Sequence, residues 1–447
     1  MIKPLLTFLS ILLLTSSLYA QEVEESWVKR YNGPGNGGEN ALAIKVDPAG
    51  NVYVAGYSPG SGTSADYATI KYYPDGETAW ERRYNGPANG YDAARALAVD
   101  GTGNVYVTGG SPGIGTSDDY ATIKYDPKGK ELWVRRYDGP YSDSDRSYAI
   151  AVDKDENVYV TGTSGKFLNQ DYATIKYDKK GKERWVQRHN GPGNRNDRAN
   201  ALSLDPLGNI CVTGISFGTS NDYLTIKYDS KGNELWVKRY NGPMDGEDEA
   251  TTLETDLSGN IYVTGGSDGN GTGRDYLTVK YNPEGKIIWE KRYNGARTEF
   301  DQARALSVDT SGNVYVTGES YNPGTGLDYV TIKYYPNGDT AWVRRYNGPA
   351  DGNDYAKAIM VDNSGDVYVT GYSPGEESSY DYTTVKYNSD GEIAWVKRYD
   401  GTGNQIDWAQ DIAIDAFNNV YVTGRSEGRG SAYDFVTIKY VQLPASK

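Results

Sequence analysis

The chain has 447 residues, and its composition excludes several classes of protein. It contains 54 glycines and 41 tyrosines, but only 6 phenylalanines and 3 methionines. A helical bundle would be poorer in glycine, and a disordered chain would not reach 13% aromatic residues. The net charge of −14 is spread along the chain, so binding to nucleic acid, which needs a basic surface, is not expected.

The N-terminal segment differs from the remainder of the chain. Lys3 is followed by an apolar run over 5–14 and then by small residues. This pattern predicts a secretory signal peptide over 1–20, cleaved before Gln21, and a short linker over 21–26. An uncleaved N-terminal anchor is the alternative. We therefore expect a secreted, periplasmic or cell-surface protein with no membrane span after signal cleavage.

Internal repetition dominates the chain after residue 26. Each unit reads approximately W-V-x-R-Y-N-G-P, a loop, A-x-A-L-x-V-D, G-N-V-Y-V-T-G, a second loop and D-Y-x-T-I-K-Y. The tryptophans that begin the units recur every 51–53 residues, at positions 27, 80, 133, 185, 236, 289, 342 and 395. A fixed period of this length indicates a repeat architecture.

Each unit contains four short runs of β-branched and aromatic residues, which predict strands. In the second unit the predicted strands are 80–84, 94–99, 104–108 and 120–125. Asp- and Gly-containing turns follow the second and fourth of these runs, whereas the other two connections are longer, variable loops. Because strand direction alternates in a meander, both tight turns lie at one end of the sheet and both long loops at the other.

The repeat predicts an all-β protein with a single eight-bladed β-propeller over 27–440 and a C-terminal tail over 441–447. A four-stranded sheet with two half-apolar faces cannot bury itself, but eight copies packed radially can. The small residues of A-x-A-L-x-V-D favour the axis, and the bulky Trp/Arg run favours the rim. The first strand is then expected to complete the last blade and to clamp the chain ends together. We expect a monomer.

The strings GNVYVTG, DYATIKYDPKG and ELWVRRYDGP resemble the bacterial and archaeal SBBP β-propeller repeat family, and more distantly the NHL and YVTN propeller repeats. The resemblance covers 27–440 and implies an extracytoplasmic or cell-surface propeller. It brings no catalytic residues to transfer. Cys211, His189 and Phe435 replace repeat tyrosines, and we interpret them as packing substitutions. The single cysteine also excludes an internal disulfide.

Five charged positions recur in every unit. One acidic set precedes the A-x-A run, at positions 39, 92, 145, 197, 248, 301, 354 and 407. A second acidic set ends that run, a third opens the D-Y run, and the last two sets are the Lys of T-[IV]-K-Y and the Arg of the rim strand. Recurrence in every unit favours a structural hydrogen-bond network over a binding site. The alternative is a carboxylate ring that holds Ca²⁺ at the long-loop mouth. No other cofactor or metal is predicted.

A ligand site on a symmetric ring should appear as a departure from the repeat. The clearest departures are loop aromatics that stand just before the A-x-A run, and these candidate ligand-binding residues are Tyr91, Phe300, Tyr355 and Trp408. The other long loop adds Tyr321, Tyr380 and Tyr433. Exposed rings can stack on sugars or anchor a peptide. Packing of each ring over its own blade edge is the competing interpretation.

We therefore expect a non-enzymatic binding or adhesion scaffold, with carbohydrate or protein of the cell envelope as its partner on the long-loop face. No catalytic residue is predicted, because no blade offers an acid–base pair that the other blades lack. The alternatives are an extracellular polysaccharide lyase or hydrolase with a site at the same face, and a structural module without a ligand.

Overall fold

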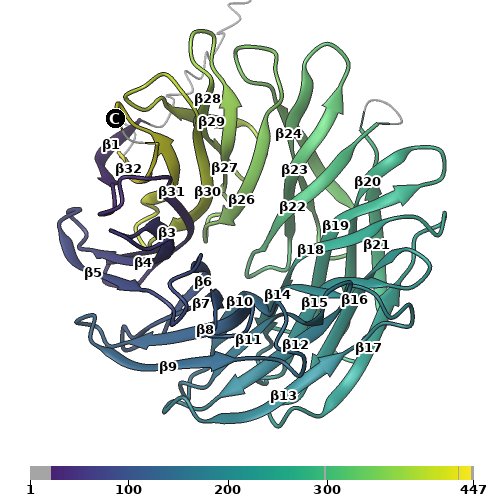
Figure 1. Ribbon diagram of the computed structural model, residues 1–447. Helices are drawn as coiled ribbons and strands as arrows, with labels where there is room; N and C mark the ends of the chain where they lie inside the picture. The colour runs from purple at the N-terminus through teal and green to yellow at the C-terminus, as the bar shows by residue number, and fades with distance from the viewer. Residues whose placement is uncertain (1–21, 296–298, 431, 444–447) are drawn as a thin grey trace, which may run out of the picture.

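The computed structural model describes residues 22–295, 299–430 and 432–443, and it confirms an all-β, eight-bladed propeller (Figure 1). Each blade is a four-stranded antiparallel sheet. In the described part of the chain, no helix is long and apolar enough to cross a membrane. The expected signal peptide over 1–20 lies outside the described residues.

The first four blades follow one another along the chain. Blade 1 consists of β2 (Asn40–Val46), β3 (Val52–Pro59), β4 (Ala65–Tyr72) and β5 (Thr78–Tyr84). Blade 2 consists of β6 (Ala93–Val99), β7 (Val105–Pro112), β8 (Asp118–Tyr125) and β9 (Glu131–Tyr137). Blade 3 consists of β10 (Arg146–Val152), β11 (Val158–Lys166), β12 (Asn169–Tyr177) and β13 (Glu183–His189). Blade 4 consists of β14 (Arg198–Leu204), β15 (Ile210–Phe217), β16 (Asn221–Tyr228) and β17 (Glu234–Tyr240).

The remaining blades continue the ring. Blade 5 consists of β18 (Asp248–Thr255), β19 (Ile261–Gly269), β20 (Gly273–Tyr281) and β21 (Ile287–Tyr293). Blade 6 consists of β22 (Asp301–Val308), β23 (Val314–Asn322), β24 (Gly326–Tyr334) and β25 (Thr340–Tyr346). Blade 7 consists of β26 (Tyr355–Val361), β27 (Val367–Pro374), β28 (Tyr380–Tyr387) and β29 (Ile393–Tyr399). Blade 8 consists of β30 (Asp407–Ile414), β31 (Val420–Glu427), β32 (Tyr433–Gln442) and β1 (Val23–Tyr31).

The A-x-A strands surround the axis, as the sequence predicts. The inner strand of each blade contacts the inner strands of its neighbours, for example β2 with both β6 and β30. The Trp/Arg strands lie at the outer edge of each sheet, where the circumference is widest. Each inner strand also contains a register shift near its start, such as that between Ala41 and Ala43 in β2, so one residue bulges out of the ladder.

Ring closure uses the first and last strands of the chain. The order of the last sheet is β1-β32-β31-β30, which confirms that the first strand completes blade 8 (Figure 1). The pairing runs from Val23↔Gln442 to Tyr31↔Phe435. Strand β1 therefore begins four residues before the predicted start at Trp27, within the segment predicted as a linker. Strand β32 extends to Gln442, past the predicted end at residue 440, because β1 pairs with it as far as Gln442.

The Asp residues that end the inner strands form the tight turns. Asp100 Oδ1 accepts hydrogen bonds from the backbone N–H groups of Thr102 and Asn104, at 2.9 and 3.0 Å. Its Oδ2 accepts from the Asn104 side chain and from the Tyr106 hydroxyl, at 2.7 and 2.8 Å. Gly103 takes a positive φ of 83°, which the turn requires. This acidic set therefore has the structural role that its turn position indicates.

The hydrophobic core lies between the blades, and tyrosine and tryptophan supply much of it. Tyr67 is fully buried, and its hydroxyl donates to the carbonyl of Ala121 in the next blade, at 3.2 Å. The Trp80 indole packs 6.0 Å from the Tyr125 ring and donates to the Pro127 carbonyl at 3.1 Å. Large aromatic side chains with satisfied polar atoms explain how a chain with only 37% hydrophobic residues builds a core.

Candidate functional site

The rim arginines form an ion-pair layer near the long loops. Arg83 donates to Asp66 Oδ2 at 2.8 Å, to Ser58 Oγ at 2.9 Å and to the hydroxyl of Tyr31 in blade 8 at 2.9 Å. The same Arg–Asp ion pair recurs in all eight blades, as 30–434, 83–66, 136–119, 188–171, 239–222, 292–275, 345–328 and 398–381. Its contacts join strands and neighbouring blades, which supports the predicted structural network.

The repeat lysines do not belong to that layer. Lys71 Nζ donates to the Pro127 carbonyl of the next blade at 3.3 Å, and Lys280 donates to the Pro336 carbonyl at 3.1 Å. These acceptors lie in tight turns, at the opposite end of the sheets from the Arg–Asp pairs. The sequence therefore suggests one Asp–Lys–Arg network, whereas the structure separates it into two layers, each of which ties one blade to its neighbour.

The acidic set that precedes the inner strands is buried. Asp92 is fully buried, and its Oδ2 accepts a hydrogen bond from the Gly86 N–H at 2.8 Å. Burial raises the pKa of Asp92 above its ordinary value, and it raises the pKa of Asp354 to about 6. These carboxylates accept hydrogen bonds from backbone N–H groups of the long loops, so they hold the loops onto the blades.

The residue at each inner-strand bulge faces the axis of the ring. Leu42, Arg95, Tyr148, Asn200 and Thr251 come from five successive blades and line one cavity of about 330 Å³. The bulge explains this placement, because the extra residue leaves the ladder and turns toward the axis. The residue type at this position differs among the blades, and the remaining blades carry Arg304, Lys357 and Gln410 there. The axial cavity is therefore where the ring loses its symmetry.

Basic side chains gather in and beside the axial cavity. Arg198 donates to Glu249 Oε1 at 2.8 Å, and Arg274 donates to Glu249 Oε2 at 3.0 Å. The Arg95 guanidinium lies 5.4 Å from the centroid of the Tyr148 ring, and its Nε is buried without a hydrogen bond in the described part of the chain. One carboxylate thus pairs with two guanidinium groups, and the Nε donor of Arg95 remains unpaired.

An aromatic and cationic cluster lies across blades 7 and 8. The Trp408 ring stacks on Tyr372 with centroids 4.9 Å apart, and the Arg425 guanidinium lies 3.9 Å above Trp408. Tyr355 packs 5.1 Å from Tyr372, and Lys357 Nζ lies 5.2 Å from the Tyr372 ring. Both faces of Trp408 are therefore covered. Trp408 Nε1 and Arg425 Nε are buried without a hydrogen bond among the residues described.

The structure brings together only some of the predicted site aromatics. Tyr355 and Trp408 meet through Tyr372, Tyr380 packs edge-on against Tyr372, and the Arg425 guanidinium lies over the Tyr433 ring. Tyr91 is 48% exposed and packs on Tyr57, 5.2 Å away. Phe300 is 40% exposed. No ring contact joins Tyr91, Phe300 or Tyr321 to the cluster over the described ranges.

The residues that bring positive charge to the axial cavity and to the cluster across blades 7 and 8 are not among those predicted from the sequence. Arg95 and Lys357 occupy the x of A-x-A, and Arg425 occupies the slot after V-T-G. The signal was present, because these two slots differ from blade to blade while their neighbours are constant. The pattern does not show orientation, however, and only the bulge turns the x of A-x-A toward the axis.

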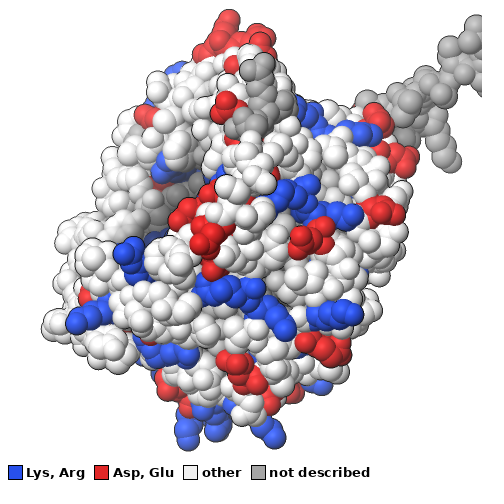
Figure 2. All heavy atoms as spheres, turned by 90° about the vertical axis from the view of Figure 1, so that its right-hand side faces the viewer, with Lys and Arg blue, Asp and Glu red and all other residues white. Residues whose placement is uncertain are grey.

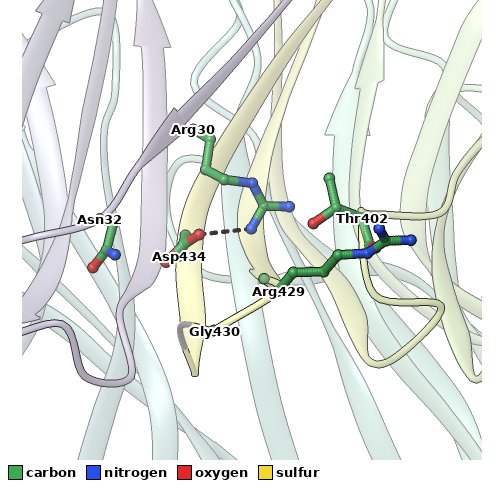
Figure 3. A pocket seen from close by; sticks show the side chains of 7 residues that line it. Arg30, Asn32, Thr402, Arg429, Gly430 and Asp434 are labelled. Carbon is green, nitrogen blue, oxygen red and sulfur yellow. Dashed lines mark hydrogen bonds and ion pairs between the residues drawn. The ribbon is translucent and has the colours of Figure 1, made fainter.

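A larger cavity of about 760 Å³ lies at the closure seam (Figure 3). Arg30 points toward Asp434 there and forms the 2.7 Å ion pair of blade 8. Arg429 donates through Nε to the Thr402 carbonyl at 2.7 Å. Both arginines of the cavity are thus held by the protein, and we assign this cavity to the seam between β1 and β32.

The two residues that carry enzyme-like side chains occupy packing positions. His189 lies with its ring edge-on to Tyr172 at 6.4 Å, as Tyr84 lies against Tyr67, and burial lowers its pKa. Cys211 is fully buried, and burial raises the pKa of its thiol to about 12. A thiol in this state is a poor nucleophile.

On the face that Figure 2 shows, acidic and basic side chains alternate without a large patch of either sign.

Two models of known protein families match the chain. A model of the SBBP family, described as a β-propeller repeat, matches residues 394–429. A second model, PQQ_2, described as outer membrane protein assembly factor BamB, matches residues 122–370. The chain is thus a β-propeller repeat protein. Since the second match covers more than half of its length, the chain belongs to the PQQ_2 family.

More distant similarities connect the chain to other proteins. An uncharacterized WD repeat-containing protein of Acanthamoeba polyphaga mimivirus is 24% identical over 397 residues, and the match covers 80% of this chain and 24% of that protein. The chain thus spans about a quarter of the length of that relative. Sqt1 of Chaetomium thermophilum, solved with the N-terminus of a ribosomal protein, has a TM-score of 0.59 at 10% identity over 94% of this chain and 100% of its own. The polysaccharide lyase Uly1 has a TM-score of 0.47 at 12% identity over 81% of this chain and 93% of its own.

Proposed function

We propose that the protein is a non-enzymatic binding scaffold that takes an acidic carbohydrate at its axial mouth. The observation that carries this proposal is a set of buried donors without a hydrogen-bond partner in the described part of the chain: Arg95 Nε at the axial cavity, and Trp408 Nε1 and Arg425 Nε in the cluster across blades 7 and 8. A buried donor without a partner costs about 1–3 kcal/mol, and a ligand acceptor removes that cost. Each of these groups donates only, so the complementary ligand carries acceptors.

Charge and shape narrow the ligand class. Carboxylates pair with guanidinium groups through short, charge-assisted hydrogen bonds, and sugar hydroxyls supply further acceptors. Tyr355 and Trp408 are locked by Tyr372 and Arg425, so they form a rigid rim rather than free stacking platforms. The arginines therefore recognise the ligand, and the aromatic rings around them hold the arginines in position. This changes the role predicted for Trp408 from the sequence.

The test is binding of neutral and acidic glycans to the mature chain, first on an array and then by calorimetry. Arg95→Met and Arg425→Met are expected to weaken binding of an acidic glycan at least about tenfold each, because each removes a charge-assisted hydrogen bond. Arg184→Met, on the rim with a half-exposed side chain, is the matched control and should bind normally. The double variant Tyr355→Ala/Trp408→Ala should also lose binding and should melt at a lower temperature, because it removes the packing of both rings on Tyr372.

A result of equal affinity in the arginine variants and the control would contradict the site. Failure of the mature chain to bind any acidic glycan would contradict the ligand class.

A second candidate is a polysaccharide lyase at the same mouth. It is favoured by one observation, namely that Arg95 and Arg198 lie 5.4 and 5.9 Å from the Tyr148 ring. An arginine can neutralise a uronate carboxylate while a tyrosine hydroxyl moves the neighbouring proton. Release of unsaturated sugar from an acidic polysaccharide, with loss of activity in Tyr148→Phe, would favour the lyase over the scaffold.

We also propose that the chain is exported to the periplasm or cell surface as a monomer. The basic start, apolar run and small residues of the N-terminal segment support export. N-terminal sequencing of the protein recovered outside the cytoplasm should begin at Gln21, and an N-terminus at Met1 would contradict cleavage.

A further inference from the structure

Two cationic side chains of neighbouring blades lie together at the axis. Lys357 stands at the bulge of β26, where the register shifts after Ala356. Arg304 stands at the equivalent bulge of β22, where the register shifts after Ala303. Strands β22 and β26 are neighbouring inner strands that contact each other, and the charge of Arg304 acts on Lys357. The amine of Lys357 therefore faces the axis beside a second positive charge.

The Lys357 amine has no ion-pair or hydrogen-bond partner among the described residues. Its Nζ lies 5.7 Å from the centroid of the Tyr355 ring and 5.2 Å from that of Tyr372. The repeat lysines also lie over tyrosine rings, but they are held in place; Lys280, for example, donates to the Pro336 carbonyl at 3.1 Å. Because Lys357 is half-buried rather than enclosed, small molecules can reach its amine.

The carboxylate that could neutralise Lys357 is bound to the arginine instead. The Glu319 side chain is 1% exposed, and its Oε1 accepts hydrogen bonds from both Nε and Nη2 of Arg304, the first at 2.8 Å. Glu319 Oε2 accepts no hydrogen bond from the residues described, although its charge acts on Lys357 and Tyr372 of blade 7. Arg304 Nη1 also lacks an acceptor within the described ranges. One buried acceptor and one guanidinium N–H group thus remain free beside the amine.

These surroundings favour the uncharged form of the amine. Burial, and after it the like charge of Arg304, lowers the pKa of Lys357 below its ordinary value. Glu319 acts in the opposite direction, but it shares its charge with Arg304. The tyrosine rings attract an ammonium group only weakly at the distances given above. A lysine that is withdrawn from water next to another cation is an arrangement that makes the amine a nucleophile.

We propose that Lys357 forms an imine with small carbonyl compounds that carry a carboxylate, such as aldehydo and keto acids. The lone pair of Nζ attacks the carbonyl carbon, and a C=N double bond replaces the C=O bond. The two hydrogens of the neutral amine leave with the carbonyl oxygen as water. The free Nη1 group of Arg304 pairs with the carboxylate of the ligand.

The reaction site goes beyond the proposed function and does not depend on it. Glycan recognition there rests on Arg95, Trp408 and Arg425, whereas imine formation uses Lys357 and Arg304. Either proposal can therefore fail while the other stands.

The test is reductive labelling of the mature protein with a limiting amount of glyoxylate and cyanoborohydride, which converts the imine to a stable carboxymethyl amine. Peptide mass spectrometry then gives the rate at each lysine. Lys357 is expected to react at least about tenfold faster than Lys180, an exposed turn lysine, because a lower pKa leaves more of the amine uncharged. Glycolaldehyde, a neutral aldehyde of similar size, should show a smaller preference for Lys357.

Two variants serve as a matched pair. Lys357→Arg keeps the positive charge and places at this bulge the residue that Arg95 and Arg304 supply in blades 2 and 6, so it should melt normally and lose the fast phase of labelling. Lys180→Arg should retain that phase. The rates in the wild-type chain decide the question even if a variant fails to fold.

A Lys357 rate no higher than that of Lys180, or a fast phase retained in Lys357→Arg, would overturn the proposal. An equal preference with glycolaldehyde would overturn the assignment of a carboxylate-bearing ligand.

Discussion

At the scale of single residues, most of the recurring charges hold the propeller together and few are free for ligands. Asp100 builds a turn, Arg83 joins two blades and Asp354 anchors a loop. The axial arginines differ because some of their N–H groups have no hydrogen-bond acceptor among the described residues. The presence or absence of a hydrogen-bond partner therefore separates structural from candidate functional residues more sharply than charge alone does.

The buried carboxylates make stability depend on pH. Asp354 is fully buried, near Asp328 and Arg398, and its pKa in the folded protein is raised to about 6 from an ordinary value of 3.8. The folded state therefore binds the proton more tightly, so this residue lowers the free energy of unfolding as pH rises from about 4 to about 6. We expect Asp354→Asn to reduce this loss, by about 1–3 kcal/mol at pH 8 relative to pH 4.

Urea unfolding at several pH values measures the effect. Asp390→Asn, at an exposed position, should leave the pH dependence of the wild-type chain unchanged. A pH dependence in Asp354→Asn identical to that of the wild-type chain would show that Asp354 ionises normally in the fold.

At the scale of elements, the tight turns work as contacts between blades as well as connections within them. The β8–β9 turn of blade 2 lies against Trp80 of blade 1 and accepts its indole N–H at the Pro127 carbonyl. In the same turn, Gly129 has a φ of 79°, and a Cβ there would stand 2.7 Å from the Trp80 ring. The turn thus needs glycine for two reasons.

Two glycine-to-alanine variants separate these reasons. Gly115 has a φ of 80° but an open environment, so Gly115→Ala should cost only the conformational strain, about 1 kcal/mol of unfolding free energy. Gly129→Ala should cost about 2–4 kcal/mol, because the indole must also move. Chemical denaturation measures both. Equal losses in the two variants would show that the turn does not press against the neighbouring blade.

At the scale of the whole molecule, repetition made the fold predictable, whereas the site was harder to predict. The spacing of the tryptophans indicated eight units, and the alanines of 94–98 indicated the axial strand. The start of β1 at Val23 was missed because those residues lack the repeat pattern and pair only through the distant β32. Arg95 and Tyr148 were missed because a bulge, which leaves no clear sequence signal, turns them to the axis.

Closure of the ring by β1 brings residues from different blades together around one axis. Its most direct test is thermal unfolding of the mature chain without residues 22–31, with and without a synthetic peptide of that segment. Removal exposes the interface that buries Trp27, so we predict a melting temperature lower by more than about 10 °C and its recovery with the peptide. An unchanged melting temperature in the shortened chain would contradict closure by β1.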